Sequence, residues 1–261
     1  MRPRKRFGQH FLHDPAVIER IVAAIAPRSG DLLVEIGPGP GVLTGPLLDM
    51  TDALEVIEID RDLAADLRTR YAARPELRIH EGDALAFDYA ALAQERGRKM
   101  RVVGNLPYNI STPLLFHLLG AGHALIDMHF MLQKEVVDRI VAAPGSKQYG
   151  RLGVMLAPRV HATKLLDIGP GAFRPPPKVW SALVRMEMRT DPPQWATLPQ
   201  FGAVVSAAFG QRRKTLRNAL SGLLSAAQIS AAGVDPGARA ETLAAADFGR
   251  LALAVAAAAP L

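Results

Sequence analysis

Residues 31–41, Asp31-Leu-Leu-Val-Glu-Ile-Gly-Pro-Gly-Pro-Gly41, decide the fold of this 261-residue chain. The first six residues are mostly apolar, as in a buried strand, and they lead directly into a glycine-rich loop. Residues 42–48 can form the helix that follows. A strand, a glycine loop and a helix N-terminus together bring backbone close to a phosphate or a nucleoside. We therefore expect Gly37 and Gly39 to contact a ligand, and their G-x-G-x-G spacing disfavours a dinucleotide.

Strands and helices alternate on both sides of this stretch, which predicts an α/β fold with a doubly wound sheet. Further strands are expected at residues 54–60, 77–80, 101–103, 124–132, 164–168 and 179–188. Beyond residues 191–193 the composition changes to Ala and Leu, and the pattern predicts only helices, at 201–209, 215–224, 226–232, 239–244 and 247–258. The chain is therefore expected to form two domains, residues 1–190 and a small all-α domain at 191–261.

Two acidic residues are expected at the carboxyl edge of this sheet. Glu58 lies 21 residues after Gly37, where such folds place a carboxylate that accepts from both ribose hydroxyls. Asp60 and Asp62 are rivals, and Asp60 can instead cap the next helix. Asp83 follows the third strand and can accept from the N6 amine of an adenine, although a helix cap is the alternative for this residue too.

The stretch Gly104-Asn-Leu-Pro-Tyr108 ends the fourth strand at the same edge. Pro107 fixes its own φ and restricts Leu106 to an extended conformation, so the carbonyls here point in set directions. Asn105 adds an acceptor amide and Tyr108 adds a flat ring. This combination suits a planar base with an exocyclic amino group. The alternative is a plain strand-to-helix turn with a half-buried tyrosine.

Phe173 lies at the centre of a stiff loop, residues 169–177, that is rich in Gly and Pro. A hydrophobic residue in such a loop usually packs into the hydrophobic core. The alternative is a second stacking face opposite Tyr108, which would sandwich a flipped base.

The net charge of +6 is concentrated at the two ends of the chain. Four cations stand within the first six residues, and residues 176–261 hold nine basic and five acidic residues. This distribution favours a polyanionic partner over a merely solvated surface. Cations at a helix N-terminus oppose the helix dipole, so phosphate contacts explain the C-terminal cluster better. The expected RNA-binding residues are Arg4, Lys5, Arg6, Arg212, Arg213, Lys214 and Arg217.

Composition excludes several classes of site. The chain contains no Cys, which removes disulfides, thiolate nucleophiles and Cys-based metal sites and fits a reducing cytoplasm. Its seven His lack ligand spacing, so no metal site is expected. No apolar run is long enough to span a membrane, and no apolar segment follows the basic start as in a secretory signal. We therefore expect a cytoplasmic protein.

Several motifs together resemble the KsgA/RsmA family of bacterial rRNA adenine dimethyltransferases over nearly the whole chain. The Asn-Leu-Pro-Tyr segment looks like the signature of methyltransferases that act on amino nitrogens. In chain order the motifs are Lys5-Arg-Phe-Gly-Gln-His-Phe-Leu12, Glu35-Ile-Gly-Pro-Gly-Pro-Gly41, Val56-Ile-Glu-Ile-Asp60, Gly82-Asp-Ala84, Gly104-Asn-Leu-Pro-Tyr-Asn-Ile-Ser111, Met131-Leu-Gln-Lys-Glu135, Phe173-Arg-Pro-Pro-Pro-Lys-Val179 and Phe209-Gly-Gln-Arg-Arg-Lys-Thr-Leu216.

The resemblance implies a class I methyltransferase (Rossmann-like) fold with S-adenosylmethionine as the methyl donor. It implies N6,N6-dimethylation of two adjacent adenines near the 3′ end of 16S rRNA, within the small ribosomal subunit or its precursor, by a monomer. The family's cofactor-contacting positions map onto His10, Leu12, Gly37, Glu58, Asp83 and Asn105. Family members often have Asn where this chain has His10, so the contact there is expected to be partly through the backbone.

Three other functions are open to such a sequence. The related enzymes that dimethylate large-subunit rRNA and confer macrolide resistance share the Asn-Leu-Pro-Tyr type of motif. The start at Lys5 and the segments at 133–135 and 145–149 favour the small-subunit enzyme. A non-catalytic ribosome assembly factor would not need the intact donor and acceptor motifs. A nicotinamide dehydrogenase is disfavoured by the glycine spacing.

Overall fold

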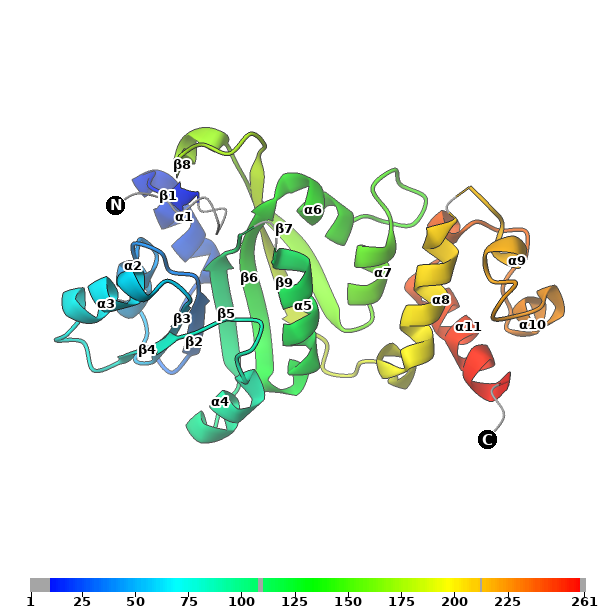
Figure 1. The fold of residues 1–261 in the computed structure, drawn as a ribbon, viewed down its shortest axis with the longest axis horizontal. Helices are drawn as coiled ribbons and strands as arrows, with labels where there is room; N and C mark the ends of the chain where they lie inside the picture. Colours follow the sequence, from blue (N-terminus) through cyan, green and yellow to red (C-terminus); the bar gives the residue numbers. More distant parts are fainter. Residues whose placement is uncertain (1–9, 108–109, 212, 259–261) are drawn as a thin grey trace. The chain divides into compact units, whose positions relative to one another are not determined.

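The computed structural model describes residues 10–107, 110–211 and 213–258, and its chain forms two compact units (Figure 1). The first unit comprises Met1–Val137 and Thr163–Met188, and the second comprises Asp138–Ala162 and Arg189–Leu261. The longer segment of the second unit begins at Arg189, close to the expected boundary at residue 191. The second unit also includes residues 138–162, which the sequence analysis assigned to the first domain.

The first unit is built on a mixed sheet with the strand order β4-β3-β2-β5-β6-β9-β7. Neighbouring strands from β4 to β6 pair in parallel, and β9 pairs antiparallel with β6. The predicted α/β class is therefore confirmed. The strands are β2 (Leu32–Ile36), β3 (Leu54–Glu58), β4 (Leu77–Glu81), β5 (Met100–Asn105), β6 (Leu125–Gln133), β7 (Val160–Ile168) and β9 (Ser181–Met188).

Helices cover both faces of the sheet. The helix α1 (Pro15–Ile25) begins where the Asp14 side chain accepts from the Val17 N–H at 3.2 Å, and it buries Ile21 and Ile25. One core cluster joins residues of α1, α2 (Thr44–Leu48) and α3 (Arg61–Arg70) to one face of the sheet. Figure 1 shows α5 (Ser111–Gly120) on the opposite face. The helix α4 (Tyr89–Arg96) also belongs to this unit, and α6 (Lys134–Ile140) begins in the first unit and ends in the second.

The chain reverses its direction of winding between β2 and β5, which are neighbours in the sheet. Gly104 allows this pairing, because a β-carbon at residue 104 would lie 2.5 Å from the carbonyl oxygen of Ile36. The next residue, Asn105, ends β5 at the carboxyl edge. In open α/β sheets, ligands bind in the crevice at such a switch point.

A pair of two-residue strands, which the sequence pattern did not indicate, adjoins this edge. β1 (Phe11–Leu12) pairs antiparallel with β8 (Phe173–Arg174), so Phe11 lies opposite Arg174 and Leu12 opposite Phe173. The pairing joins the N-terminal segment to the proline-rich loop.

The second unit has a helical core of its own. It contains α7 (Arg151–Leu156), α8 (Pro199–Gly210), α9 (Leu216–Ala219), α10 (Ala226–Ala231) and α11 (Ala245–Ala258). Phe201 and Phe248 are buried in a cluster that also includes Tyr149, whose hydroxyl donates to the carbonyl of Leu243 at 2.7 Å.

Two of the expected C-terminal helices are shorter than predicted. The segment 215–224 forms only the four residues of α9, because Ser221 and Gly222 are poor helix formers and Ser225 starts α10 with a capping box. The segment 239–244 contains only a 3₁₀ turn, Ala240–Thr242. No helix in the described part of the chain is long and apolar enough to cross a membrane.

Candidate active site

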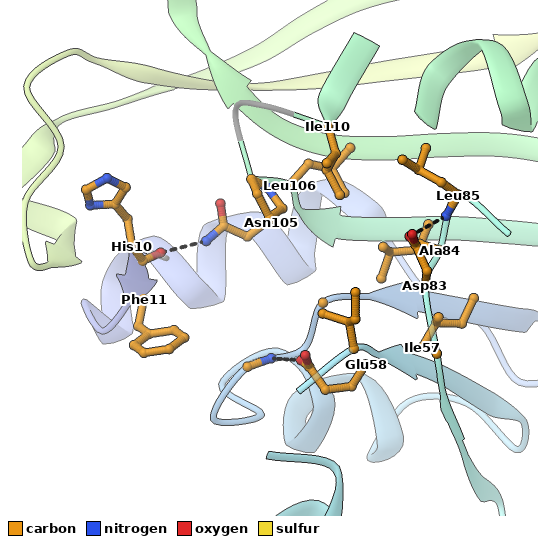
Figure 2. A pocket seen from close by; sticks show the side chains of 16 residues that line it. His10, Phe11, Ile57, Glu58, Asp83, Ala84, Leu85, Asn105, Leu106 and Ile110 are labelled. Atoms are coloured by element: carbon orange, nitrogen blue, oxygen red, sulfur yellow. Dashed lines mark hydrogen bonds between the residues drawn. The ribbon is translucent and has the colours of Figure 1, made fainter. Parts of the chain in front are cut away.

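A pocket of about 170 Å³ lies at the carboxyl ends of β2, β3, β4 and β5 (Figure 2). The topology of the sheet creates this site, because the carboxyl ends of parallel strands bring residues that are far apart in the sequence to one edge of the sheet. Most of the residues predicted for the donor and acceptor sites meet here. Those lining the pocket are His10, Gly37, Gly39, Glu58, Asp83, Asn105, Leu106 and Pro107.

The Glu58 carboxylate is held by backbone on two sides. Its Oε2 accepts from the Gly39 N–H at 3.1 Å, and its Oε1 accepts from the Asp60 N–H at 2.9 Å. Gly39 has a φ of +57°, which favours glycine and turns its N–H toward the carboxylate. Burial raises the pKa of Glu58, and these two hydrogen bonds oppose the rise. Asp60 caps α3 through the Asp62 N–H at 3.1 Å, the alternative predicted for it.

Asp83 forms a local turn and also lines the pocket. Its Oδ1 accepts from the Leu85 N–H at 2.9 Å (Figure 2). Each carboxylate oxygen has two lone pairs, so this bond leaves acceptor capacity toward the pocket. Asp83 thus makes a turn and not the helix cap that was its alternative, because the next helix, α4, is capped by Asp88.

Apolar residues between these carboxylates form the flat walls of the pocket, and the sequence analysis did not single them out. Ile57, Ile59 and Leu85 all line it, and Ile59 is 48% exposed. An isoleucine directly after the strand-end carboxylate Glu58 is the sequence signal that could have indicated an apolar wall at this position. Such walls suit the faces of a planar ring system.

Asn105 is oriented by the N-terminal segment. Its Nδ2 donates to the main-chain carbonyl of His10 at 3.0 Å, and Figure 2 shows its oxygen on the opposite side. The imidazole of His10 is turned away, because its Nδ1 lies 2.7 Å from the carbonyl oxygen of Pro175 and donates to it. His10 therefore reaches Asn105 through its backbone.

The residues after Asn105 are fixed by backbone hydrogen bonds. The Leu106 N–H donates to the carbonyl of Met131 at 3.2 Å, and the Pro107 carbonyl accepts from the Ile110 N–H at 3.2 Å. Tyr108, predicted to stack on a base, lies outside the described residues.

Leu12 and Phe173 lie beside the pocket and do not line it. Each is 2% exposed, and both belong to the core cluster of the first unit. Leu12 instead borders a smaller adjacent cavity together with Glu35 and Asn105. The structure thus places the Phe173 side chain in the hydrophobic core, which was the first of its two predicted alternatives. Its ring is packed among other core side chains, and stacking of Phe173 on a flipped base stays a prediction.

Glu35 is an ionisable residue of the site region that the sequence analysis passed over. It is 1% exposed, and its Oε2 accepts from the Thr44 hydroxyl at 2.6 Å. Burial raises the pKa of Glu35 to about 7, the Thr44 hydrogen bond lowers it, and the nearby Glu58 raises it further. An acidic residue within an otherwise apolar strand was the available signal.

The C-terminal cations that the structure describes are exposed and lie at the start of a helix, α9, as expected. Arg213 and Lys214 lie in the turn between α8 and α9, and Arg217 lies in α9. Arg213 and Lys214 also follow the C-terminus of α8, where the helix dipole favours positive charge, so the dipole argument for phosphate contact is weaker than the sequence alone suggested. Exposure of all three remains compatible with an RNA contact. Arg4, Lys5, Arg6 and Arg212 lie outside the described residues.

Comparisons with known proteins agree with this geometry. The family described as "Ribosomal RNA adenine dimethylase" matches residues 1–257. The chain is 59% identical over 246 residues to "Ribosomal RNA small subunit methyltransferase A" of Methylococcus capsulatus, covering 94% of this chain and 95% of the relative. It is 57% identical over 250 residues to the protein of that name from Nitrosococcus oceani, covering 95% and 94%.

Two solved structures are similar over most of the chain. A dimethyladenosine transferase from Plasmodium falciparum aligns with a TM-score of 0.77 at 25% identity, covering 93% of this chain and 96% of that one. The 23S rRNA methyltransferase ErmE aligns with a TM-score of 0.72 at 26% identity, covering 94% and 99%.

Proposed function

This chain belongs to the ribosomal RNA adenine dimethylase family, and from that premise we propose that it dimethylates the N6 amines of two adjacent adenines near the 3′ end of 16S rRNA. The methyl donor of the family is S-adenosylmethionine. The observation that carries the proposal is the convergence of Glu58, Asp83 and Asn105 on one pocket at the sheet's switch point.

The residues of the pocket fit the donor part by part. Glu58 offers two backbone-anchored carboxylate oxygens for the ribose hydroxyls. Asp83 can accept from the adenine amine, while Ile57, Ile59 and Leu85 supply apolar contact to the ring. S-adenosylmethionine, when bound, supplies an electrophilic methyl group on a sulfonium that carries its own leaving group.

Asn105 and Leu106 would hold the accepting nitrogen. An adenine N6 lone pair is delocalised into the ring, which makes the amine a poor nucleophile. Hydrogen bonds from N6–H to Asn105 Oδ1 and to the Leu106 carbonyl draw the nitrogen toward tetrahedral geometry and free the lone pair. No strong base is needed, since the nitrogen becomes acidic once it is alkylated and can then release its proton. The chain's task is mainly to position the reactants for in-line attack.

The small-subunit assignment is supported by the relatives. Those named for the small subunit are 53–59% identical to this chain, whereas the similar 23S rRNA methyltransferase structure is 26% identical. We further propose that residues 191–261, with Arg213, Lys214 and Arg217, contact the ribosomal particle. The protein is proposed to act as a monomer in the cytoplasm.

Methylation of isolated ribosomal subunits tests the function. Purified protein and radiolabelled S-adenosylmethionine are added separately to small and large subunits that lack adenine dimethylation. We expect dimethyladenosine in small-subunit rRNA at two adjacent positions, mapped by primer extension. Label confined to large subunits would establish the macrolide-resistance type of activity, and no label in either would favour an assembly factor without catalysis.

A further inference from the structure

Trp180 is the most exposed large hydrophobic side chain in the described part of the chain, at 54%. It directly precedes β9, and its neighbour Val179 is 44% exposed. An exposed indole loses the free energy of burial, roughly 25 cal/mol per Å² of apolar area. The Trp180 side chain belongs neither to the lining of the donor pocket nor to the hydrophobic core clusters. It is therefore available to contact a binding partner.

Strand register places Trp180 on the rim of the sheet, the carboxyl edge that also carries the Asn105 end of the pocket. Asn105 is aligned with Met131 of β6, and Met131 is aligned with Leu183 of β9. Trp180 lies three residues before Leu183 on a strand antiparallel to β6, so it projects beyond the carboxyl edge of the sheet. With strands about 4.8 Å apart and a rise of about 3.3 Å per residue, the Cα atoms of Asn105 and Trp180 are on the order of 15 Å apart. A few nucleotides of unstacked strand can span that distance.

The segment that carries Trp180, residues 175–180, is anchored by a hydrogen bond at each of its two ends. At one end the Pro175 carbonyl accepts from His10, whose own carbonyl orients Asn105. At the other end the Trp180 carbonyl accepts from the Lys134 N–H at 2.9 Å. The indole lies against Gly169, where an added β-carbon would be 3.7–3.9 Å from the ring. The ring is therefore presented on a supported backbone.

The same segment is positively charged. Residues 168–180 include Arg174 and Lys178, both exposed, and no acidic residue. Cations interleaved with an exposed aromatic ring are the combination that binds single-stranded nucleic acid, in which phosphates meet the charges and a base stacks on the ring.

We propose that Trp180 is a stacking platform for an unpaired base that flanks the target adenine in the substrate RNA. The inference rests on the proposed function, since it places the flanking RNA along the rim from the Asn105 pocket past Arg174 and Lys178. Stacking is tolerant of sequence, because every base has a π-face. The platform would therefore fix the path of the strand and contribute affinity without selecting the base.

Binding and turnover of Trp180→Ala and Trp180→Phe test this platform. Trp180→Ala should weaken binding to unmethylated small subunits by about tenfold and leave its salt dependence unchanged, because no counterion-releasing cation is lost. Trp180→Phe keeps an aromatic face and should retain most of the affinity. The matched control is Ile126→Ala, which removes a side chain that is 47% exposed at the opposite end of β6.

Fluorescence identifies the partner of the indole. The chain has two Trp, and Trp195 packs against Phe201 in the second unit. A short single-stranded oligoadenylate should quench the emission of the wild-type protein but not that of Trp180→Phe. The inference is overturned if Trp180→Ala binds subunits as tightly as the control while dimethylating them, a result that leaves the proposed function intact. It is also overturned if binding weakens but the RNA causes no Trp180-dependent quenching, which would point to a protein partner.

Discussion

The side-chain amide of Asn105 donates to the main-chain carbonyl of His10 at 3.0 Å. These residues are 95 positions apart in the sequence, and the bond fixes which end of the amide faces away from the N-terminal segment. His10 is itself tied to Pro175 at 2.7 Å. The group that we propose accepts from a substrate amine is thus held in place by the fold, which lowers the cost of ordering it during the reaction.

The donor site can be tested separately from RNA binding. Glu58→Ala and Asp83→Ala should each weaken S-adenosylmethionine binding, because they remove the proposed acceptors for the ribose hydroxyls and the adenine amine. Calorimetric titration measures the affinity, and small-subunit binding should be unaffected. Glu81→Ala is a suitable control, since Glu81 ends the neighbouring strand and pairs with Arg61 on the surface. Unchanged donor affinity in both pocket variants would remove these assignments.

The exposed cations of the second unit should govern the salt dependence of binding. Replacing Arg213 and Lys214 by Ala should weaken binding to small subunits and flatten the plot of log affinity against log salt, because fewer counterions are released. Donor affinity should not change. A control that removes two exposed arginines of the first unit, Arg20 and Arg28, should have the original slope. Equal slopes of log affinity against log salt for all three proteins would show that the Arg213–Lys214 turn is solvated and does not contact phosphates of the particle.

Glu35 should make stability depend on pH. Its pKa is raised from 4.5 to about 7 in the folded state, so between these values the folded state holds a proton that the unfolded state has released. The free energy of unfolding therefore falls as pH rises from 4.5 to 7, by about 3 kcal/mol in total, and this contribution is constant above pH 7.

Glu35→Gln should remove that contribution, since an amide does not titrate. Urea unfolding at several pH values should show the variant gaining stability relative to wild type from pH 4.5 to 7 and no further above it. Exposed Glu95, replaced by Gln, serves as the control. A difference between Glu35→Gln and wild type that is the same at every pH would contradict a raised pKa.

Gly104 should tolerate no side chain. A β-carbon there would lie 2.5 Å from the Ile36 carbonyl oxygen, which forces β2 and β5 apart. Gly104→Ala should therefore cost about 1–3 kcal/mol of stability, as overpacking does, and should reduce donor affinity. Gly120→Ala is the matched control, because a β-carbon at the end of α5 meets no atom within 4 Å. Equal thermal midpoints for the two variants would contradict the proposed close contact.

Local patterns were sufficient to predict the sheet and most of the pocket. Apolar runs that end in glycine or an acidic residue located β2, β3, β4 and β5, and parallel strands necessarily brought Glu58, Asp83 and Asn105 to one edge. The pairing of β1 with β8 could not be predicted in this way. It depends on a contact between Leu12 and Phe173, which lie 161 residues apart in the sequence.

The remaining differences also arise from tertiary contacts. Phe173 is equally suited by composition to a base or to a core, and its place in the core cluster depends on packing that only the folded chain shows. The assignment of residues 138–162 to the second unit likewise depends on contacts such as that of Tyr149 with Leu243. Neither contact leaves a periodic signal in the sequence.

Single-turnover methylation by Asn105→Ala tests the central claim most directly. Unmethylated small subunits are mixed with excess enzyme and S-adenosylmethionine, and mono- and dimethyladenosine are quantified over time, with donor and subunit binding checked separately. Loss of one preorganised transition-state hydrogen bond should slow methyl transfer by on the order of 10²–10³ while subunit binding is retained. A near-normal rate of methyl transfer by Asn105→Ala would contradict the role assigned here to the Asn105 amide.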